Sequence, residues 1–170
     1  MNKTIENIMT RVSCRNFSEK KVSLGKVKQI VEAGKYAPSG MNRQICHILV
    51  VRSKSKVEKI RKAAASLFGR DALYGASTIC IVYGKKDQPL LIQDGSVIME
   101  NMLVAAHSLG IDSCWIHCIK DIVPTPNTKL AKELGISEEY QVVGSAALGY
   151  RKDGTEIAIK PRKDDFIRYL

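Results

Sequence analysis

The chain has 170 residues, of which 45% are hydrophobic, so we expect one domain with a sizeable buried core. Its 27 Lys and Arg residues outnumber its 17 Asp and Glu residues, and the resulting formal charge of +10 favours anionic partners. Because the chain has no apolar run of membrane-spanning length, no secretory signal and only 6% aromatic residues, we expect a cytoplasmic protein without a membrane segment, and we do not expect nucleic acid as its main partner.

The first predicted helix leads into a short basic segment. Ile5, Ile8, Met9 and Val12 follow helical spacing and predict a helix over residues 3–10. The segment that follows reads Arg11-Val12-Ser13-Cys14-Arg15-Asn16-Phe17. Arginine offers a planar fork of donors that matches a phosphate, and positions 11, 13, 15 and 17 share one face if the chain is extended. This pattern predicts an anion clamp; the alternative is a solvated basic turn.

A second predicted helix ends in a loop rich in turn-forming residues. Ser23 is a suitable N-cap for this helix, and Pro38 limits its other end because the residue before a proline disfavours helical geometry. The loop, residues 37–44, reads Ala37-Pro38-Ser39-Gly40-Met41-Asn42-Arg43-Gln44. Such side-chain amides and turn formers are typical of a surface loop.

Strands and helices alternate in the rest of the chain. Apolar runs predict strands over residues 45–51, 78–83, 113–118, 142–148 and 166–170, and periodic patterns predict helices over 55–67, 96–109 and 127–134. Asp94 is a suitable cap for the long helix, while Gly110 and Gly135 suit helix ends. No G-x-G-x-x-G or P-loop sequence follows a strand, so any bound phosphate must be held by side chains.

Cysteine and histidine positions do not form a recognisable metal or disulfide pattern. The five cysteines are odd in number and favour reduced thiols, although the arginines beside Cys14 could lower its pKa. Cys114, His117 and Cys118 do not make a tetrahedral set if they lie on a strand, so we expect no metal. His47 lies in an apolar run and is expected to be a core or interface residue.

Several motifs in order resemble the nitroreductase family of FMN-dependent oxidoreductases. The resemblance extends from residue 4 to about residue 163. It rests on the two segments quoted above, on the Cys114-Trp115-Ile116 strand and on a helical stretch that reads Asn101-Met102-Leu103-Val104-Ala105-Ala106-His107-Ser108-Leu109-Gly110.

The resemblance implies an α+β fold in one domain, residues 1–170, with a central, mostly antiparallel sheet flanked by helices. It also implies an intertwined homodimer with two FMN sites at the interface and the helix over residues 96–109 near its centre. The C-terminal tail, about residues 160–170, would pack on the partner subunit as an added edge strand; the alternatives are a strand in its own sheet or a frayed end.

The family's cofactor-binding positions can be transferred to this chain one at a time. Arg11, Val12 and Ser13 would contact the phosphate and ribityl chain, and Arg15 would lie near N1 and the C2 carbonyl of the flavin. The backbone near Ile116 would approach N5 and O4. The loop of the partner subunit would lie against the flavin ring with Pro38, Ser39, Gly40 and Asn42. Near the C-terminus, Lys160 and Arg162 would close the phosphate site. His117 and Cys118 fall at the N5 turn but differ from the family's usual small or acidic residues.

The implied activity is hydride transfer from NAD(P)H through flavin N5 to nitroaromatic, quinone or related small-molecule acceptors, in a ping-pong cycle. The flavin carries this chemistry, so no acid–base dyad is required, and His117 is a candidate proton donor to the acceptor. Alternatives are other flavin chemistry, such as dehalogenation, substrate oxidation or flavin breakdown, and an FMN-binding module without turnover.

Overall fold

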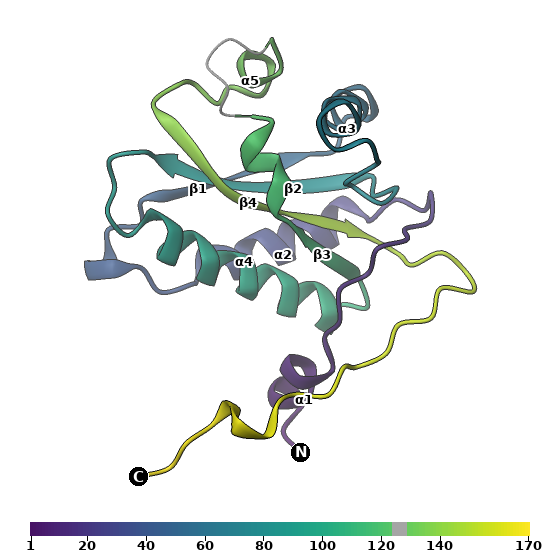
Figure 1. Ribbon diagram of the computed structural model, residues 1–170, viewed down its shortest axis with the longest axis vertical. Coiled ribbons are helices and arrows are strands. Elements are labelled where there is room, and N and C mark those ends of the chain that lie inside the picture. Colours follow the sequence, from purple (N-terminus) through teal and green to yellow (C-terminus); the bar gives the residue numbers. More distant parts are fainter. Residues whose placement is uncertain (124–128) are drawn as a thin grey trace.

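The computed structural model describes residues 1–123 and 129–170 and shows a four-stranded sheet with helices on both faces (Figure 1). The strands are β1 (Cys46–Val51), β2 (Thr78–Lys85), β3 (Asp112–Ile116) and β4 (Tyr140–Gly149). Their spatial order is β1-β2-β4-β3, and each neighbouring pair is antiparallel. The predicted α+β fold with an antiparallel sheet is therefore confirmed.

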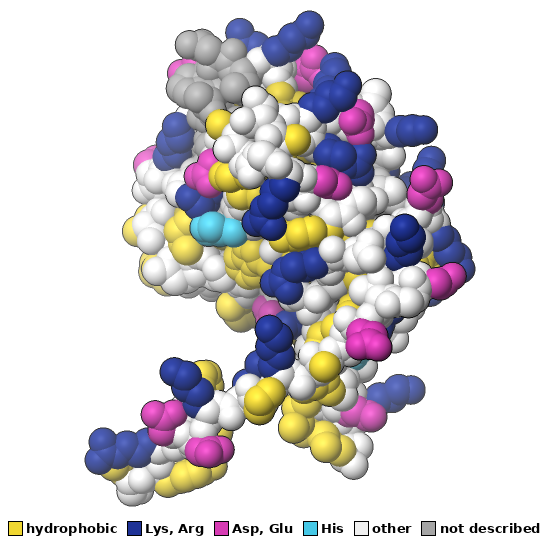
Figure 2. Space-filling view, turned by 45° about the vertical axis from the view of Figure 1, so that its right-hand side comes forward, with side chains coloured by type: hydrophobic (Ala, Val, Ile, Leu, Met, Phe, Trp, Pro, Cys, Tyr) yellow, Lys and Arg dark blue, Asp and Glu magenta, His cyan; other side chains and the backbone are white. Residues whose placement is uncertain are grey.

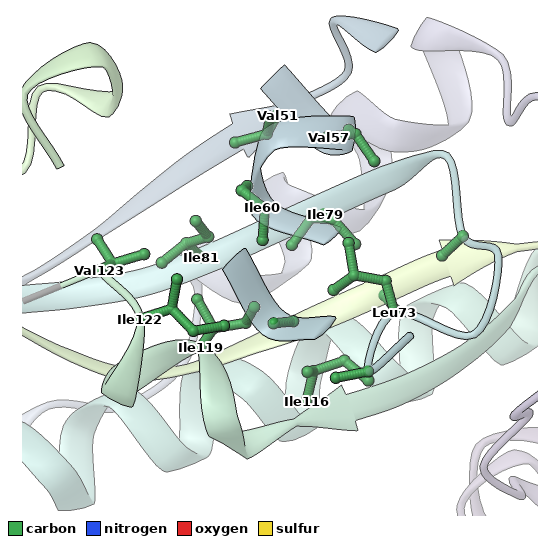
Figure 3. Close-up of a cluster of buried hydrophobic side chains, with 14 of the residues drawn as sticks. Val51, Val57, Ile60, Leu73, Ile79, Ile81, Ile116, Ile119, Ile122 and Val123 are labelled. Carbon is green, nitrogen blue, oxygen red and sulfur yellow. The ribbon is translucent and has the colours of Figure 1, made fainter. Parts of the chain in front are cut away.

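Each face of the sheet carries its own hydrophobic cluster. Helices α2 (Leu24–Lys35) and α4 (Leu91–Ser108) cover one face (Figure 1). The other face is covered by α3 (Lys54–Phe68), the 3₁₀ turn η2 (His117–Asp121) and α5 (Lys129–Leu134). Successive β2 residues alternate between the clusters, because side chains of a strand point to opposite faces. Ile79 and Ile81 point toward α3 and η2, as Figure 3 shows, while Cys80 and Val82 join the cluster under α2 and α4.

A β-bulge in β4 brings the long helix α4 close to the sheet. Val82 is opposite Gly144 and Tyr83 is opposite Val142, so Val143 is an extra residue on the bulged strand. A Cβ on Gly95 of α4 would lie 2.6 Å from a methyl group of Val143. The helix can approach the bulge this closely only because position 95 has no side chain.

Most predicted element ends agree with the structure. The helix α1 spans Lys3–Thr10, and the Ser23 hydroxyl oxygen accepts from the Lys26 amide at 3.3 Å, as expected of an N-cap. Gly110 and Gly135 have φ values of 68° and 69°, the left-handed geometry that glycine allows after a helix.

Three sequence predictions about these elements were wrong. The long helix begins at Leu91, so Asp94 lies in its first turn and not at its cap. Strand β3 ends at Ile116, because the chain turns into η2 there. The tail is not a strand of its own sheet: it forms only a short 3₁₀ turn, η3 (Asp164–Phe166), and pairs with no strand among the described residues, while its packing on a partner subunit stays a prediction. His47 is exposed on β1, where its ring packs against Tyr83 and Tyr140, so it is not a core residue, and its place at an interface stays a prediction. Residues 127–128 of the predicted helix 127–134 lie outside the described residues.

Helix α1 has an apolar face that this chain does not cover. Ile5, Ile8 and Met9 share the predicted face, yet each is more than half exposed, and α1 contains no buried residue. Figure 2 shows hydrophobic side chains gathered on the two parts that project below the body, α1 and the tail with Phe166 and Tyr169. Among the described residues, no helix combines the length and apolar character needed to span a bilayer.

The five cysteine thiols are free, and burial raises the pKa of each. Desolvation raises the pKa of Cys46 to about 11 and that of Cys80 to about 12. Cys14 is fully buried, and desolvation raises its pKa as well, since it outweighs the lowering by its backbone hydrogen bond and by Arg151. A thiolate stabilised by the flanking arginines, the alternative considered from the sequence, is therefore wrong.

We expect Ile60→Ala to lower the free energy of unfolding by about 2–5 kcal/mol, because it removes a fully buried α3 side chain and leaves a cavity. Leu67→Ala on the same helix is the matched control: Leu67 is 60% exposed and should cost well under 1 kcal/mol. Urea unfolding of both variants at one protein concentration measures the difference. Equal losses would contradict the assignment of Ile60 to the core.

We expect the native thiols to react slowly with an alkylating reagent at pH 7.5, because a raised pKa leaves little thiolate at that pH. The rate should increase as the pH rises above 9, and unfolding in urea should remove the protection. Mass spectrometry of labelled peptides checks each site. Labelling of Cys14 at the rate of an unfolded peptide at pH 7.5 would contradict its burial.

Candidate functional site

The segment over residues 11–17 is extended and fixed along the edge of β3. Ser13 forms a parallel bridge with Ser113, and the Cys14 amide donates to the Ser113 carbonyl at 2.9 Å. The Phe17 amide donates to the Tyr74 carbonyl at 3.0 Å. Buried Cys14 and Phe17 anchor the segment in the core, so the residues between and before them are held at the surface.

A cleft of about 460 Å³ separates this segment from the C-terminal part of the chain. Arg11, Val12, Ser13 and Arg15 line one side, and the other side is formed by residues 155–160 and Arg162. In Figure 1 the two segments, from opposite ends of the sequence, run close together beside β3 and α1. The fold thus brings together both basic groups that the sequence singled out, including Lys160.

The charge in this cleft is strongly positive, and one of its donors has no acceptor. The cationic lining residues are Arg11, Arg15, Lys160 and Arg162, against the single carboxylate of Glu156. Nη1 of Arg11 is buried and makes no hydrogen bond to any described residue. A buried donor without a partner is destabilising, so its presence points to an acceptor from outside the chain. An anion such as a phosphate would provide that acceptor and would also offset the excess positive charge.

Two side-chain hydrogen bonds connect the elements around the cleft. Nδ2 of Asn16 donates to the Thr155 hydroxyl at 3.0 Å and ties the two sides to each other. At the other end, the Thr10 hydroxyl lies 2.9 Å from Nε2 of His107 and attaches α1 to the last turn of α4. These contacts leave the cleft's basic groups free to bind a ligand.

The loop over residues 37–44 has an unusual backbone. Met41, Asn42 and Gln44 have φ values of 51°, 53° and 50°, which non-glycine residues rarely adopt. Gln44 stabilises this shape, since its amide donates to the Ser39 hydroxyl and its side chain donates to Asn42. The Gly40 amide donates to Oδ1 of buried Asp94 at 3.0 Å, which anchors the loop to the first turn of α4. Such strain in an exposed loop is a feature of ligand-contacting segments.

The loop and the cleft lie at opposite ends of α4 (Figure 1). Asp94 contacts the loop and His107 contacts α1, and at 1.5 Å per residue these two positions are about 20 Å apart along the helix. One chain therefore does not bring Pro38, Ser39, Gly40 or Asn42 to the cleft lined by Arg11.

The end of β3 forms a third part of the predicted site. Ile116 is buried and its carbonyl accepts from the Ser145 hydroxyl at 3.2 Å, so the strand end is well fixed. His117 is exposed and Cys118 is half-buried, and both lie in η2. None of these three residues lines the basic cleft. Ile116 is about 10 Å along β3 from Ser113, the residue that pairs with Ser13 in the segment over residues 11–17.

Sequence reasoning did not single out Arg70, which lies near this strand end. Its guanidinium is close enough to Cys118 to lower the thiol's pKa slightly, although burial raises it overall. The Arg70 guanidinium carbon also lies 6.0 Å from the centre of the Tyr74 ring. The sequence offered one local signal beside Arg70, the helix-ending residue Gly69. In the structure Gly69 has a φ of 67° and ends α3. Among residues 1–123 and 129–170, no cluster of His, Cys, Asp and Glu is suited to hold a metal.

The comparisons with known proteins agree on one family. A family model described as the nitroreductase family matches residues 8–72 and 65–150. An Archaeoglobus fulgidus protein, named provisionally as an NADH dehydrogenase/NAD(P)H nitroreductase, is 33% identical over 90% of this chain and 88% of its own length.

Two solved structures are similar over almost their whole length. A Bacteroides fragilis nitroreductase with bound FMN has a TM-score of 0.93 and 30% identity, covering 100% of both chains. A Desulfitobacterium hafniense nitroreductase with bound FMN has a TM-score of 0.89 and 26% identity, covering 100% of this chain and 99% of that one. Since the family match, the sequence identity and the fold all agree, the chain belongs to the nitroreductase family.

Proposed function

We propose that this protein is an FMN-dependent oxidoreductase that takes hydride from NAD(P)H and reduces small acceptors such as nitroaromatic compounds or quinones. The proposal is carried by the buried, unpartnered Nη1 of Arg11 in a cleft lined by three further cations. Relatives with this fold bind FMN, and others are named for activity with NADH or NADPH.

The cleft residues fit the phosphate end of FMN. Arg11 would donate from its free nitrogen, Ser13 would donate its hydroxyl, and Lys160 and Arg162 would add charge from the other side. Charge-assisted hydrogen bonds of this kind contribute about 1.5–3 kcal/mol each. The phosphate would therefore be bound by side chains, in the absence of a glycine-rich phosphate loop.

The residues beyond the phosphate would orient the flavin ring. When bound, FMN supplies the N5 atom that accepts a hydride and later delivers the electrons to the acceptor. Arg15, on the same face as Arg11 and Ser13, would place positive charge at the N1 and C2-carbonyl edge. The fixed strand end near Ile116 would present backbone donors toward N5 and O4, and His117, which is exposed in the turn that follows, would give a proton to an acceptor. Because donor and acceptor would use the same ring face in turn, the kinetics would be ping-pong.

We further propose that the active unit is a homodimer. The loop over residues 37–44 is attached to the first turn of α4, and α1 is attached to the last turn, about 20 Å away along the helix, so we infer that a partner's loop completes the site. The apolar face of α1 and the exposed tail are surfaces of the kind that a partner buries. Strand β1 is at an edge of the sheet and offers unpaired backbone groups to an added strand, such as the partner's tail.

We expect Arg11→Gln to weaken FMN binding about 10- to 100-fold, because it removes a charged donor of the phosphate. Lys163→Gln is the matched control, since Lys163 is in the same basic tail but does not line the cleft. Quenching of flavin fluorescence measures the affinity, and NAD(P)H oxidation with a quinone measures turnover. A wild-type protein that does not bind FMN, or one that binds it without oxidising NAD(P)H, would contradict the proposed activity.

We expect the wild-type protein to have twice the 18.8 kDa mass of one chain in light scattering. Ile8→Glu should shift it toward the monomer, because a carboxylate would be buried on the apolar face of α1. Leu67→Glu, on an exposed position of α3, should leave the mass unchanged. A monomeric wild-type protein would rule out the proposed shared site.

A further inference from the structure

A further cavity lies apart from the proposed FMN cleft. It has a volume of about 800 Å³, compared with about 460 Å³ for the cleft, and only Asn16 lines both. Its walls come from residues 16–21, from Arg52 just after β1, from the first turns of α3, from the loop before β2 and from Lys152. We call it the second cavity.

The second cavity has a strong excess of positive charge. Its cationic lining residues are Lys21, Arg52, Lys54, Arg61 and Lys152, and its carboxylates are Glu19 and Glu58. Arg61 is already neutralised, since it pairs with Glu58 and with Asp71 at 3.3 Å. Within the part of the chain that the structure describes, Lys21, Lys54 and Lys152 have no acidic partner, so their charge is available to a ligand.

Two buried polar atoms of the lining residues make no hydrogen bond. Nη2 of Arg52 donates to the Val22 carbonyl at 2.7 Å, which fixes the guanidinium, yet Nε of the same group is buried and unpartnered. The Ser77 hydroxyl is also buried without a partner among the described residues. Both residues line the cavity that also contains the unpaired lysines, and an anionic oxygen would supply the acceptor that each donor lacks.

The start of α3 adds to this preference for an anion. The N-cap residue Ser53 makes no side-chain bond to the helix backbone, and the first turn has no acidic residue. It carries Lys54 and Lys56 at the end where the helix dipole disfavours cations. A bound anion would compensate both the free amide groups and these charges.

The rest of the cavity is suited to an organic group. Phe17, Val57 and Tyr74 provide apolar lining, and the volume lies in the range of about 300–1,000 Å³ that small-molecule sites occupy. A free phosphate ion would fill only a small part of this space.

We propose that the second cavity binds a phosphate ester of nucleotide size. Its phosphoryl group lies against Arg52, Ser77 and Lys54, and its organic part lies on Phe17, Val57 and Tyr74. This site is distinct from the FMN cleft, and the proposal does not rest on the proposed flavin activity.

The test is a calorimetric titration of the full-length, FMN-saturated protein with AMP and, separately, with inorganic phosphate. We expect one AMP site per chain and weaker binding of phosphate. Lys54→Gln combined with Lys152→Gln should weaken AMP binding at least tenfold, and Ser77→Ala should weaken it several-fold. The control combines Lys62→Gln with Lys163→Gln, which removes the same charge from residues that do not line the cavity, and should stay within twofold of wild type.

In the titration of the FMN-saturated protein, any of three results would overturn the proposal: no binding of AMP, equal losses in the two double variants, or AMP affinity no greater than that for phosphate. The first leaves the cavity without a ligand of this class, and the second indicates a diffuse charge effect. If the protein takes up no FMN, the titration is made without it, on the wild type and on Arg11→Gln. A loss on Arg11→Gln as large as that on the Lys54/Lys152 variant would place AMP in the basic cleft and also overturn the proposal.

Discussion

The attachment of residues 11–17 to the edge of β3 is the interaction on which the candidate site depends. Backbone pairing at Ser13 and Ser113 keeps the segment extended, and the buried side chains of Cys14 and Phe17 hold it against the core. With these points fixed, Arg11 and Arg15 can present charge to a cleft at low entropic cost, because the backbone is already ordered. The same attachment carries the chain on to Phe17 and into the wall of the second cavity.

Part of the positive charge of this protein lies on Lys and Arg residues that line two cavities. Both cavities contain a guanidinium whose orientation leaves one buried nitrogen without an acceptor, at Arg11 in one and at Arg52 in the other. Such donors are destabilising in the isolated chain. The two proposed sites would account for part of the net charge of +10 through the binding of phosphorylated small molecules.

Helix α4 acts as a spacer between the two halves of the proposed flavin site. Its first turn holds the loop through Asp94 and Gly40, and its last turn holds α1 through His107 and Thr10. Close contact with the β-bulge at Val143 keeps the helix fixed on the sheet. The separation of loop and cleft is thus built into a rigid element, which is why we place the complete site between two subunits.

Local patterns predicted most element ends and singled out the basic residues of the segment over residues 11–17, because helical spacing, caps and arginine chemistry act over a few residues. The family and its antiparallel α+β fold followed from the resemblance of several motifs in order, and not from these local patterns. Only the tertiary structure decided that Asp94 anchors a loop, that β3 stops at Ile116 and that burial raises the pKa of Cys14. It also placed Lys160 and Arg162 in one cleft with Arg11, and Arg52 in one cavity with Ser77. These outcomes depend on contacts between residues far apart in the chain and on burial, and neither can be read from sequence neighbours.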